Sequence, residues 1–372
     1  MSTLDFTITR TDNPTPDERR EEILKDPAFG KIFSDHMAIV DWTADEGWHD
    51  ARIVPFGPFE LSPATCVLHY GQSIFEGLKA FRHEDGSVSA FRPESNARRL
   101  NNSARRLAMP ELPEELFLKA VSTLVDVDRD WVPAAGGEAS LYIRPLMFGM
   151  QETLGVGAAD RYRFVVMTSP SGAYFTGGVS PVSVWLSEDF VRAAPGGTGE
   201  AKCAGNYAAS LLAQQQAAEK GCDQVVWLDA IERRYVEEMG GMNLMFVYGS
   251  EDSDEGVTLV TPELSGSLLP GITRDSLLTV AKELGYRTEE RKISVDEWRD
   301  DVASGRMTEA LACGTAAVLT PVGTVKSEGG EFTINGNEPG EVTMKLRERL
   351  TGIQQGRVED AHGWNTTLSA AR

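Results

Sequence analysis

Long apolar segments and metal-binding residue patterns are both missing from this 372-residue sequence. No stretch approaches the roughly 18 uninterrupted apolar residues that a membrane-spanning helix needs. The four cysteines form no Cys-x-x-Cys pair, and the five histidines form no His-x-x-x-His pair. The sequence therefore gives no support for a membrane protein, a disulfide scaffold, a zinc cage or a metal centre of another kind. A Cys-His nucleophile has no positive support either, so difficult chemistry would need an organic cofactor.

Net positive charge is also missing, since the formal charge is −20 and the isoelectric point is near 4.7. A chain with this charge has no basic field to attract nucleic acid or an anionic membrane surface. Acidic residues such as Asp12, Asp17 and Glu18 occupy the first 22 positions, where no apolar signal-like run occurs. This composition predicts a soluble, cytoplasmic protein without nucleic-acid or membrane partners.

The length predicts two domains, because single cores rarely exceed 250 to 300 residues. The stretch richest in glycine, proline and serine between periodic segments is "PSGAYFTGGVSP", residues 170–181. We therefore expect an N-terminal domain over residues 1–173, in which 1–30 are an extension, a linker over 174–181 and a C-terminal domain over 182–372.

Hydrophobic periodicity predicts the elements of both halves. Strands are expected over 36–42, 51–56, 73–82 and 87–92, joined into an antiparallel sheet by turns such as Asp85-Gly86. Ala97, Leu100, Ala104 and Leu107 share one helical face, and further helices are expected over 114–130, 206–221, 272–285 and 342–356. Both halves are therefore predicted to have an α/β (α+β) fold.

One lysine, Lys202, stands within the glycine-rich segment "APGGTGEAKCAGNY". Its small neighbours leave space for a ligand, and a lysine in a dry pocket becomes a nucleophilic amine that can form a Schiff base with an aldehyde. A solvated lysine on a flexible loop explains this segment alone at least as well.

Two further patterns are compatible with an anionic, ring-containing cofactor. Glu238 follows an apolar strand entry, so its carboxylate is expected to point inward and to need a cationic partner, such as a protonated ring nitrogen. The backbone N–H groups of Ile272 and Thr273 open a helix and can bind phosphate. Taken singly, Glu238 is explained as well by an acid at an edge-strand turn that pairs with a surface basic residue. The segment at Ile272 and Thr273 is explained as well by an ordinary helix start.

Read in order, seven segments resemble the branched-chain aminotransferases of fold type IV: "YGQSIFEGLKAFR", "FRPESNARRL", "LYIRPL", "GGTGEAKCAGNY", "EEMGGMN", "LLPGITRDSLL" and "CGTAAVLTPV". The resemblance covers about residues 30 to 360. It implies a homodimer that binds pyridoxal 5'-phosphate between two α/β domains. The smaller domain would carry an open sheet with helices, and the larger a barrel-like sheet with helices.

The resemblance also implies roles for individual residues. Lys202 would be the catalytic residue that carries the cofactor as a Schiff base and moves a proton, and Glu238 would contact the pyridine nitrogen. The other cofactor contacts implied are Arg99, Tyr207, Ile272, Thr273 and Thr315. The implied substrate contacts are Phe33, Phe75, Tyr142, Arg144, Tyr174, Gly241 and Ala316, with Tyr70, Leu154 and Val156 reaching from the partner subunit.

The activity implied is reversible, ping-pong amino transfer between L-leucine, L-isoleucine or L-valine and 2-oxoglutarate. The aromatic residues would contact the branched side chain, and Arg144 with Tyr142 would bind a carboxylate. Gly241 stands where some members of the family have threonine, which changes how a substrate carboxylate is bound on that side. A D-amino-acid transaminase or an aminodeoxychorismate lyase of the same fold, and more distantly a non-catalytic acidic binding protein, are the alternatives.

Overall fold

The computed structural model describes residues 4–172 and 178–371. Its chain divides into two compact units. The first unit contains residues up to 174 together with 201–204 and 352–372, and the second contains 175–200 and 205–351. The short segment that carries Lys202 is thus grouped with the N-terminal part of the chain. Of the linker expected over 174–181, residues 174–177 lie outside the described part.

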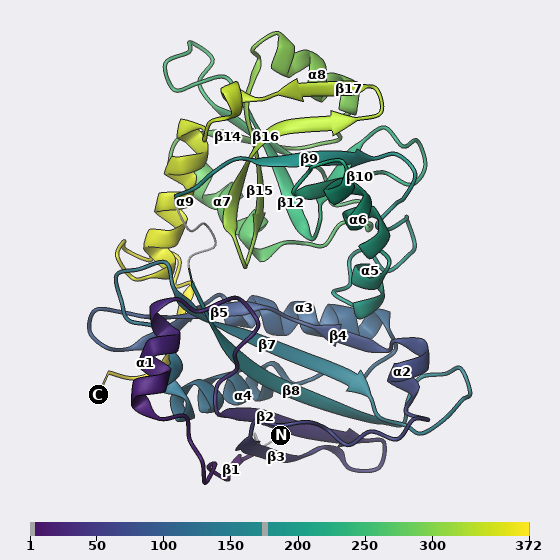
Figure 1. The fold of residues 1–372 in the computed structure, drawn as a ribbon, viewed down its shortest axis with the longest axis vertical. Coiled ribbons are helices and arrows are strands. Elements are labelled where there is room, and N and C mark those ends of the chain that lie inside the picture. Colours follow the sequence, from purple (N-terminus) through teal and green to yellow (C-terminus); the bar gives the residue numbers. More distant parts are fainter. Residues whose placement is uncertain (1–3, 173–177, 372) are drawn as a thin grey trace. The chain divides into compact units, whose positions relative to one another are not determined.

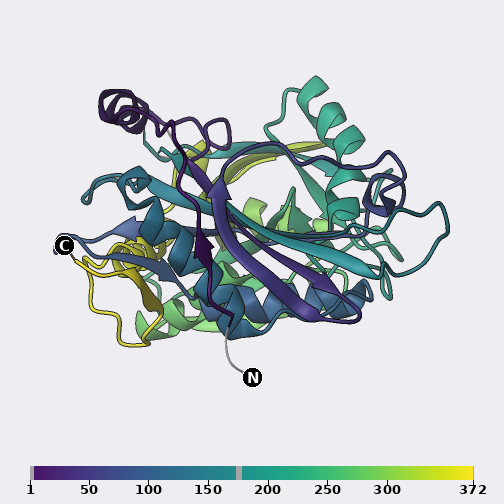
Figure 2. The same ribbon diagram turned by 90° about the horizontal axis from the view of Figure 1, so that it is seen from below.

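In the described residues, the first unit has a nine-stranded sheet with the order β1-β3-β2-β8-β7-β5-β6-β18, and β4 pairs with β7. Neighbouring strands are antiparallel except for β1 and β3. The bounds are β1 (Thr7–Ile8), β2 (His36–Thr43), β3 (Gly47–Pro55), β4 (Ser73–Phe75), β5 (Leu78–Arg82), β6 (Val88–Phe91), β7 (Ser140–Gly149), β8 (Arg161–Ser171) and β18 (Asn365–Ser369). Figure 2 shows the long, curved pair β2 and β3 beside β8.

Helices α3 (Pro93–Arg106) and α4 (Glu114–Val127) contact each other and pack against this sheet (Figure 1). α3 begins with a proline at its first position, and Ala97, Leu100 and Ala104 are buried on one face at helical spacing. Its exposed face carries Arg98 and Arg105. The remaining helices of this part are α1 (Asp17–Lys25), α2 (Cys66–Tyr70) and the 3-10 helix η1 (Arg129–Trp131).

In the described residues of the second unit, nine strands form a sheet with the order β11-β10-β9-β16-β15-β12-β13-β14, and β17 pairs with β16. Because β11 also pairs with β12, six strands close into a ring, which confirms the expected barrel-like sheet. The bounds are β9 (Val182–Ser187), β10 (Gln224–Leu228), β11 (Val236–Met239), β12 (Met242–Tyr248), β13 (Thr258–Thr261), β14 (Arg287–Glu290), β15 (Met307–Gly314), β16 (Val318–Ser327) and β17 (Gly330–Thr333).

Side chains such as Val226, Leu244 and Phe246 form the apolar core of this unit, with Trp298 of α8 packed edge-on against Phe246. In the described residues after β9, the helices are α5 (Ala204–Ala208), α6 (Leu211–Glu219), α7 (Ile272–Glu283), α8 (Val295–Ala303), the 3-10 helix η2 (Asn335–Asn337) and α9 (Glu341–Gln354).

Two expected elements are interrupted in the structure. The strand expected over 73–82 is two strands, β4 and β5, separated by Glu76 and Gly77. The helix expected over 206–221 is split into α5 and α6 next to Ser210, whose hydroxyl donates to the Tyr207 carbonyl at 2.7 Å. This side chain competes with the backbone for a helical acceptor.

No helix within residues 4–172 and 178–371 is long and apolar enough to cross a bilayer. Over the same residues, no group of three or more His, Cys, Asp or Glu side chains is arranged to hold a metal ion. All four cysteines are buried with free thiols.

Candidate active site

The backbone of Lys202 is fixed by β4 and α3 within the first unit. Its N–H donates to the Ser103 hydroxyl at 2.9 Å, and its carbonyl accepts from the Phe75 N–H at 3.0 Å. The next residue, Cys203, forms an antiparallel bridge with Ile74. Lys202 is therefore held on both sides rather than carried by a flexible loop.

An aromatic and cationic cluster surrounds the Lys202 side chain. Its Nζ lies 4.8 Å from the centre of the Phe75 ring, and the Arg144 guanidinium lies 4.7 Å from the same ring. Arg144 also donates from Nη2 to the Tyr142 hydroxyl at 3.0 Å. Gly77 makes this arrangement possible, because a Cβ there would lie 2.2 Å from the Tyr142 oxygen. The structure thus brings together four of the expected site residues.

A buried ion pair that the sequence did not reveal lies beside this cluster. Glu76 is fully buried and accepts two hydrogen bonds from Arg99, at 2.7 Å from Nε and 2.8 Å from Nη2. Asn96 donates a third to the same carboxylate at 2.7 Å. Burial alone would raise the pKa of Glu76, but Arg99, Lys202 and Asn96 hold it below its usual value. Nε and Nη2 of the Arg99 guanidinium are therefore already bound to Glu76.

These surroundings make Lys202 a better nucleophile. Burial, with Arg99 as the next cause, lowers the pKa of its ammonium to about 8, and the Glu76 carboxylate opposes this shift. A substantial fraction of the side chain is thus the neutral amine near pH 8, as attack on a carbonyl requires.

The lowered pKa predicts the pH dependence of Lys202 labelling in the cofactor-free protein. The ammonium is unreactive and the amine is reactive, so acylation of Lys202 should rise through about pH 8 and then level off. An ordinary lysine keeps gaining reactivity up to about pH 10.4. Peptide mapping after short exposure to an acylating reagent at each pH gives the midpoint. A midpoint near that of an ordinary lysine would contradict the assigned environment.

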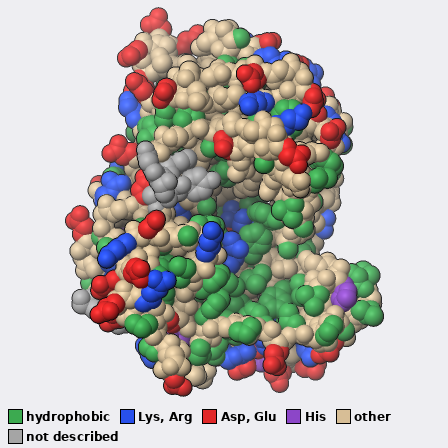
Figure 3. Space-filling view, viewed as in Figure 1, with side chains coloured by type: hydrophobic (Ala, Val, Ile, Leu, Met, Phe, Trp, Pro, Cys, Tyr) green, Lys and Arg blue, Asp and Glu red, His purple; other side chains and the backbone are tan. Residues whose placement is uncertain are grey.

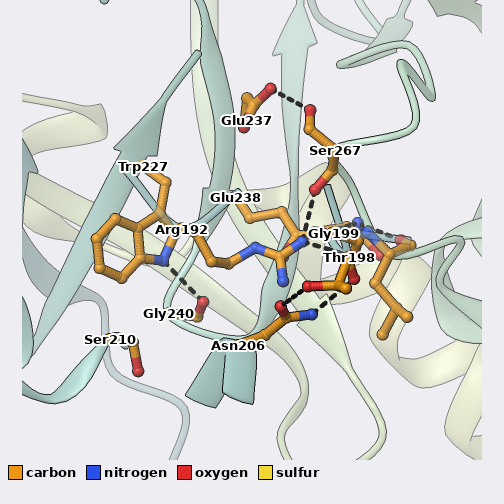
Figure 4. Close-up of polar contacts among 12 residues, drawn as sticks. Arg192, Thr198, Gly199, Asn206, Ser210, Trp227, Glu237, Glu238, Gly240 and Ser267 are labelled. Carbon is orange, nitrogen blue, oxygen red and sulfur yellow. Dashed lines mark hydrogen bonds and ion pairs between the residues drawn. The ribbon is translucent and has the colours of Figure 1, made fainter. Parts of the chain in front are cut away.

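In the second unit, Glu238 of β11 is 2% exposed and has partners on both oxygens. Oε1 accepts from the Leu269 N–H at 2.7 Å and from the Asn243 amide at 3.4 Å. Oε2 lies 2.9 Å from Nε of Arg192, and both side chains are drawn in Figure 4. The Arg192 Nε–H is not directed at an acceptor, so this contact is an ion pair rather than a hydrogen bond. The inward direction expected for Glu238 is correct, and the protein itself supplies a cationic partner.

The other expected residues of this unit lie at turns and at a helix start. Gly241 is in the β11–β12 turn, where a Cβ would be 3.4 Å from the Tyr207 ring. Ile272 and Thr273 are the first two residues of α7, whose preceding residue, Gly271, offers no side-chain cap. Thr315 and Ala316 are in the turn between β15 and β16.

For five further expected substrate residues, the structure shows other neighbours or high exposure, or the residue lies outside the described part. Phe33 stacks on Phe56, with ring centres 4.7 Å apart. Tyr70 of α2 donates to the carbonyl of Leu154, and Tyr70, Leu154 and Val156 are exposed. Tyr174 lies outside the described residues.

Sequence reasoning missed Glu76, Asn96 and Arg192. A weak signal existed for Glu76, the one acid in the otherwise largely apolar segment 73–82. For Arg192 the signal was indirect, because a buried carboxylate at Glu238 requires a cation somewhere.

Comparisons with known proteins identify the family of this chain. The family model described as amino-transferase class IV matches residues 73–325. The branched-chain-amino-acid aminotransferase of Mycolicibacterium smegmatis is 62% identical and covers 98% of this chain and 99% of its own length. That of Mycobacterium tuberculosis is 58% identical, with 98% of each chain covered. The chain therefore belongs to the class IV aminotransferase family, and within it to the branched-chain-amino-acid aminotransferases.

A solved structure gives the same result for the fold. The T.th. branched-chain amino acid aminotransferase, complexed with N-(5'-phosphopyridoxyl)-L-glutamate, is 30% identical, with a TM-score of 0.71. It covers 89% of this chain, and 99% of its own chain is matched. The fold is thus the fold type IV expected from the sequence.

Proposed function

We propose that this aminotransferase transfers the amino group of L-leucine, L-isoleucine or L-valine to 2-oxoglutarate with pyridoxal phosphate as its cofactor. The observation that carries the proposal is the cluster around Lys202. It combines an amine of lowered pKa with the aromatic ring of Phe75 and the cation of Arg144. The names of the relatives support the choice of branched-chain donors.

The residues present fit this cofactor chemically. The Lys202 amine suits an aldehyde, and the buried Glu238 carboxylate suits a protonated pyridine nitrogen. The N–H groups of Ile272 and Thr273, together with Thr315, are donors suited to phosphate. We also assign Arg99, whose Nε and Nη2 donate to Glu76, to the phosphate. Tyr207, beside Gly241, would donate to the ring hydroxyl.

When bound, pyridoxal phosphate acts as an electron sink that stabilises negative charge at the substrate α-carbon. The chain supplies the rest. Lys202 would hold the cofactor at rest, and its free amine would take the proton from the substrate α-carbon. In the cofactor-free chain, a pKa of about 8 leaves both the amine and the ammonium of Lys202 populated near neutral pH.

One pocket must accept both a branched apolar side chain and the second carboxylate of glutamate. Phe75 and Phe33 provide apolar surface for the first. Arg144, held by the Tyr142 hydroxyl, provides a charged donor for the second. We also assign Gly241, Ala316 and Tyr174 to substrate binding. At Gly241, a backbone N–H would replace the threonine hydroxyl that some members of the family have.

We further propose that the enzyme is a homodimer in which Tyr70, Leu154 and Val156 complete the partner's pocket. Leu154 is 69% exposed and Val156 is 86% exposed, and Tyr70 is bonded to the same loop. Hydrophobic side chains gather on the viewed face of the first unit in Figure 3. Apolar surface of this kind is typical of a subunit contact. A cytoplasmic location stays a prediction.

A donor panel tests the proposed substrate class. With 2-oxoglutarate as acceptor, kcat/KM for L-leucine should exceed that for D-alanine by about 100-fold or more, because the site would have to accept the opposite configuration. L-isoleucine and L-valine should fall within about tenfold of L-leucine. Preference for D-alanine, or pyruvate release from aminodeoxychorismate, would instead favour the other activities known for this fold.

A further inference from the structure

Arg192 lies after β9, at a point where three segments of the second unit meet. Its side chain is 6% exposed. Nη2 donates to the Gly199 carbonyl at 3.0 Å and to the Ser267 carbonyl at 2.8 Å, while Nε lies 2.9 Å from Glu238 (Figure 4). One side chain thus contacts a glycine-rich loop, a segment leading to α7 and a strand of the barrel.

The two carbonyls that Arg192 binds belong to segments in very close contact. A Cβ at Gly199 would lie 2.1 Å from the Ser267 oxygen, so only glycine fits there. Gly199 is three residues before Lys202, and Ser267 is two residues before Leu269, whose N–H holds Glu238. Thr198 and Asn206 add two hydrogen bonds across the same loop, at 2.6 and 2.8 Å. Arg192 therefore fixes backbone next to several proposed cofactor contacts.

The electrostatic setting gives Arg192 its second role. Glu238 and Arg192 are both more than nine-tenths buried, and an unpaired carboxylate at such a depth takes up a proton. The neighbouring acid, Glu237, also lies in the field of Arg192, but burial outweighs this charge and the hydrogen bond from the Ser267 hydroxyl, and raises the pKa of Glu237. Arg192 thus favours the ionised form of Glu238.

We propose that Arg192 is a positioning residue for amino transfer: it keeps Glu238 ionised and correctly placed to pair with the cofactor's protonated ring nitrogen. This inference rests on the proposed role of Glu238. Arg192 acts through Glu238 and through the Gly199 and Ser267 backbone, without touching the substrate.

The test compares Arg192→Met, Arg192→Lys, Glu238→Gln and the double variant Arg192→Met/Glu238→Gln. Each is measured for the Kd of pyridoxal phosphate on the cofactor-free protein, for the absorbance of the bound cofactor against pH, and for kcat and KM with L-leucine. Arg163→Met is a matched control, because Arg163 pairs with Asp41 in the other unit and with no candidate site residue.

Arg192→Met should lower kcat by about 10- to 100-fold, with KM changed by less than about threefold, and should weaken cofactor binding by about tenfold. It should also shift the pH dependence of the cofactor absorbance, as Glu238→Gln does. In the Glu238→Gln background, the same change should cost less than about threefold in kcat. Arg192→Lys keeps the positive charge and should recover part of the lost kcat and cofactor affinity. If Arg192→Met does not fold, the lysine variant is compared with wild type instead.

An equal loss in both backgrounds would overturn the inference, because Arg192 would then act independently of Glu238. So would an Arg192→Met enzyme with cofactor affinity and kcat within about twofold of wild type. If Glu238→Gln itself keeps wild-type turnover and absorbance, the proposed role of Glu238 fails instead. The two failures are therefore distinguishable.

Discussion

Replacing Lys202 with alanine abolishes amino transfer: we expect kcat for L-leucine to fall by about 10,000-fold or more, because one side chain both binds the cofactor and moves the proton. The alanine variant keeps the backbone contacts of residue 202 with Ser103 and Phe75, so the fold should persist. Turnover is measured by glutamate formation, and cofactor linkage by the absorbance of the dialysed protein.

Two controls separate lost chemistry from lost structure. Lys119→Ala removes a lysine of α4 that pairs with exposed Asp5 and should keep wild-type turnover. Small primary amines added to the Lys202→Ala enzyme should restore part of the activity, since the missing group is an amine. Turnover within about tenfold of wild type in Lys202→Ala, without added amine, would remove Lys202 from the mechanism.

Replacing Glu76 with alanine destabilises the first unit by about 3 to 5 kcal/mol, because it leaves the Arg99 guanidinium buried without its counter-ion. The loss should appear in denaturant unfolding of the cofactor-free protein, followed by a probe in that unit. The same change removes the negative charge that raises the Lys202 pKa. The labelling midpoint of Lys202 should therefore move below about 8.

Glu111→Ala is the matched control in the same unit. Glu111 pairs with Arg105 at 2.5 Å, but both side chains are about half exposed, so the expected cost is below about 1 kcal/mol. Equal losses in the free energy of unfolding for Glu76→Ala and Glu111→Ala would contradict this prediction. Burial of the Glu76–Arg99 pair would then not determine how much the pair stabilises the unit.

The sequence predicted much of the regular secondary structure and the chemical character of the Lys202 and Glu238 side chains. The helical face of Ala97, Leu100 and Ala104 is buried as expected. Glu238 points inward because apolar residues surround it in β11 and β12, and such a pattern is visible without coordinates. The order of the motifs identified the family, which the comparisons confirm.

What the sequence did not predict depends on contacts between residues distant along the chain. The break at Glu76 follows from Arg99, 23 residues later, and from the Tyr142 oxygen packed against Gly77. The pair of Arg192 and Glu238 spans 46 positions (238 − 192 = 46) and belongs to no local pattern. A local exception is Ser210, whose bond to Tyr207 interrupts a helix that periodicity alone extends.

The central claim is that Lys202 is the residue that binds the cofactor. Reducing the enzyme loaded with pyridoxal phosphate with borohydride, followed by digestion and mass spectrometry, tests it directly. We predict one phosphopyridoxyl group per chain, on the peptide that contains Lys202. A label on any other lysine, or none on this peptide, would contradict the account.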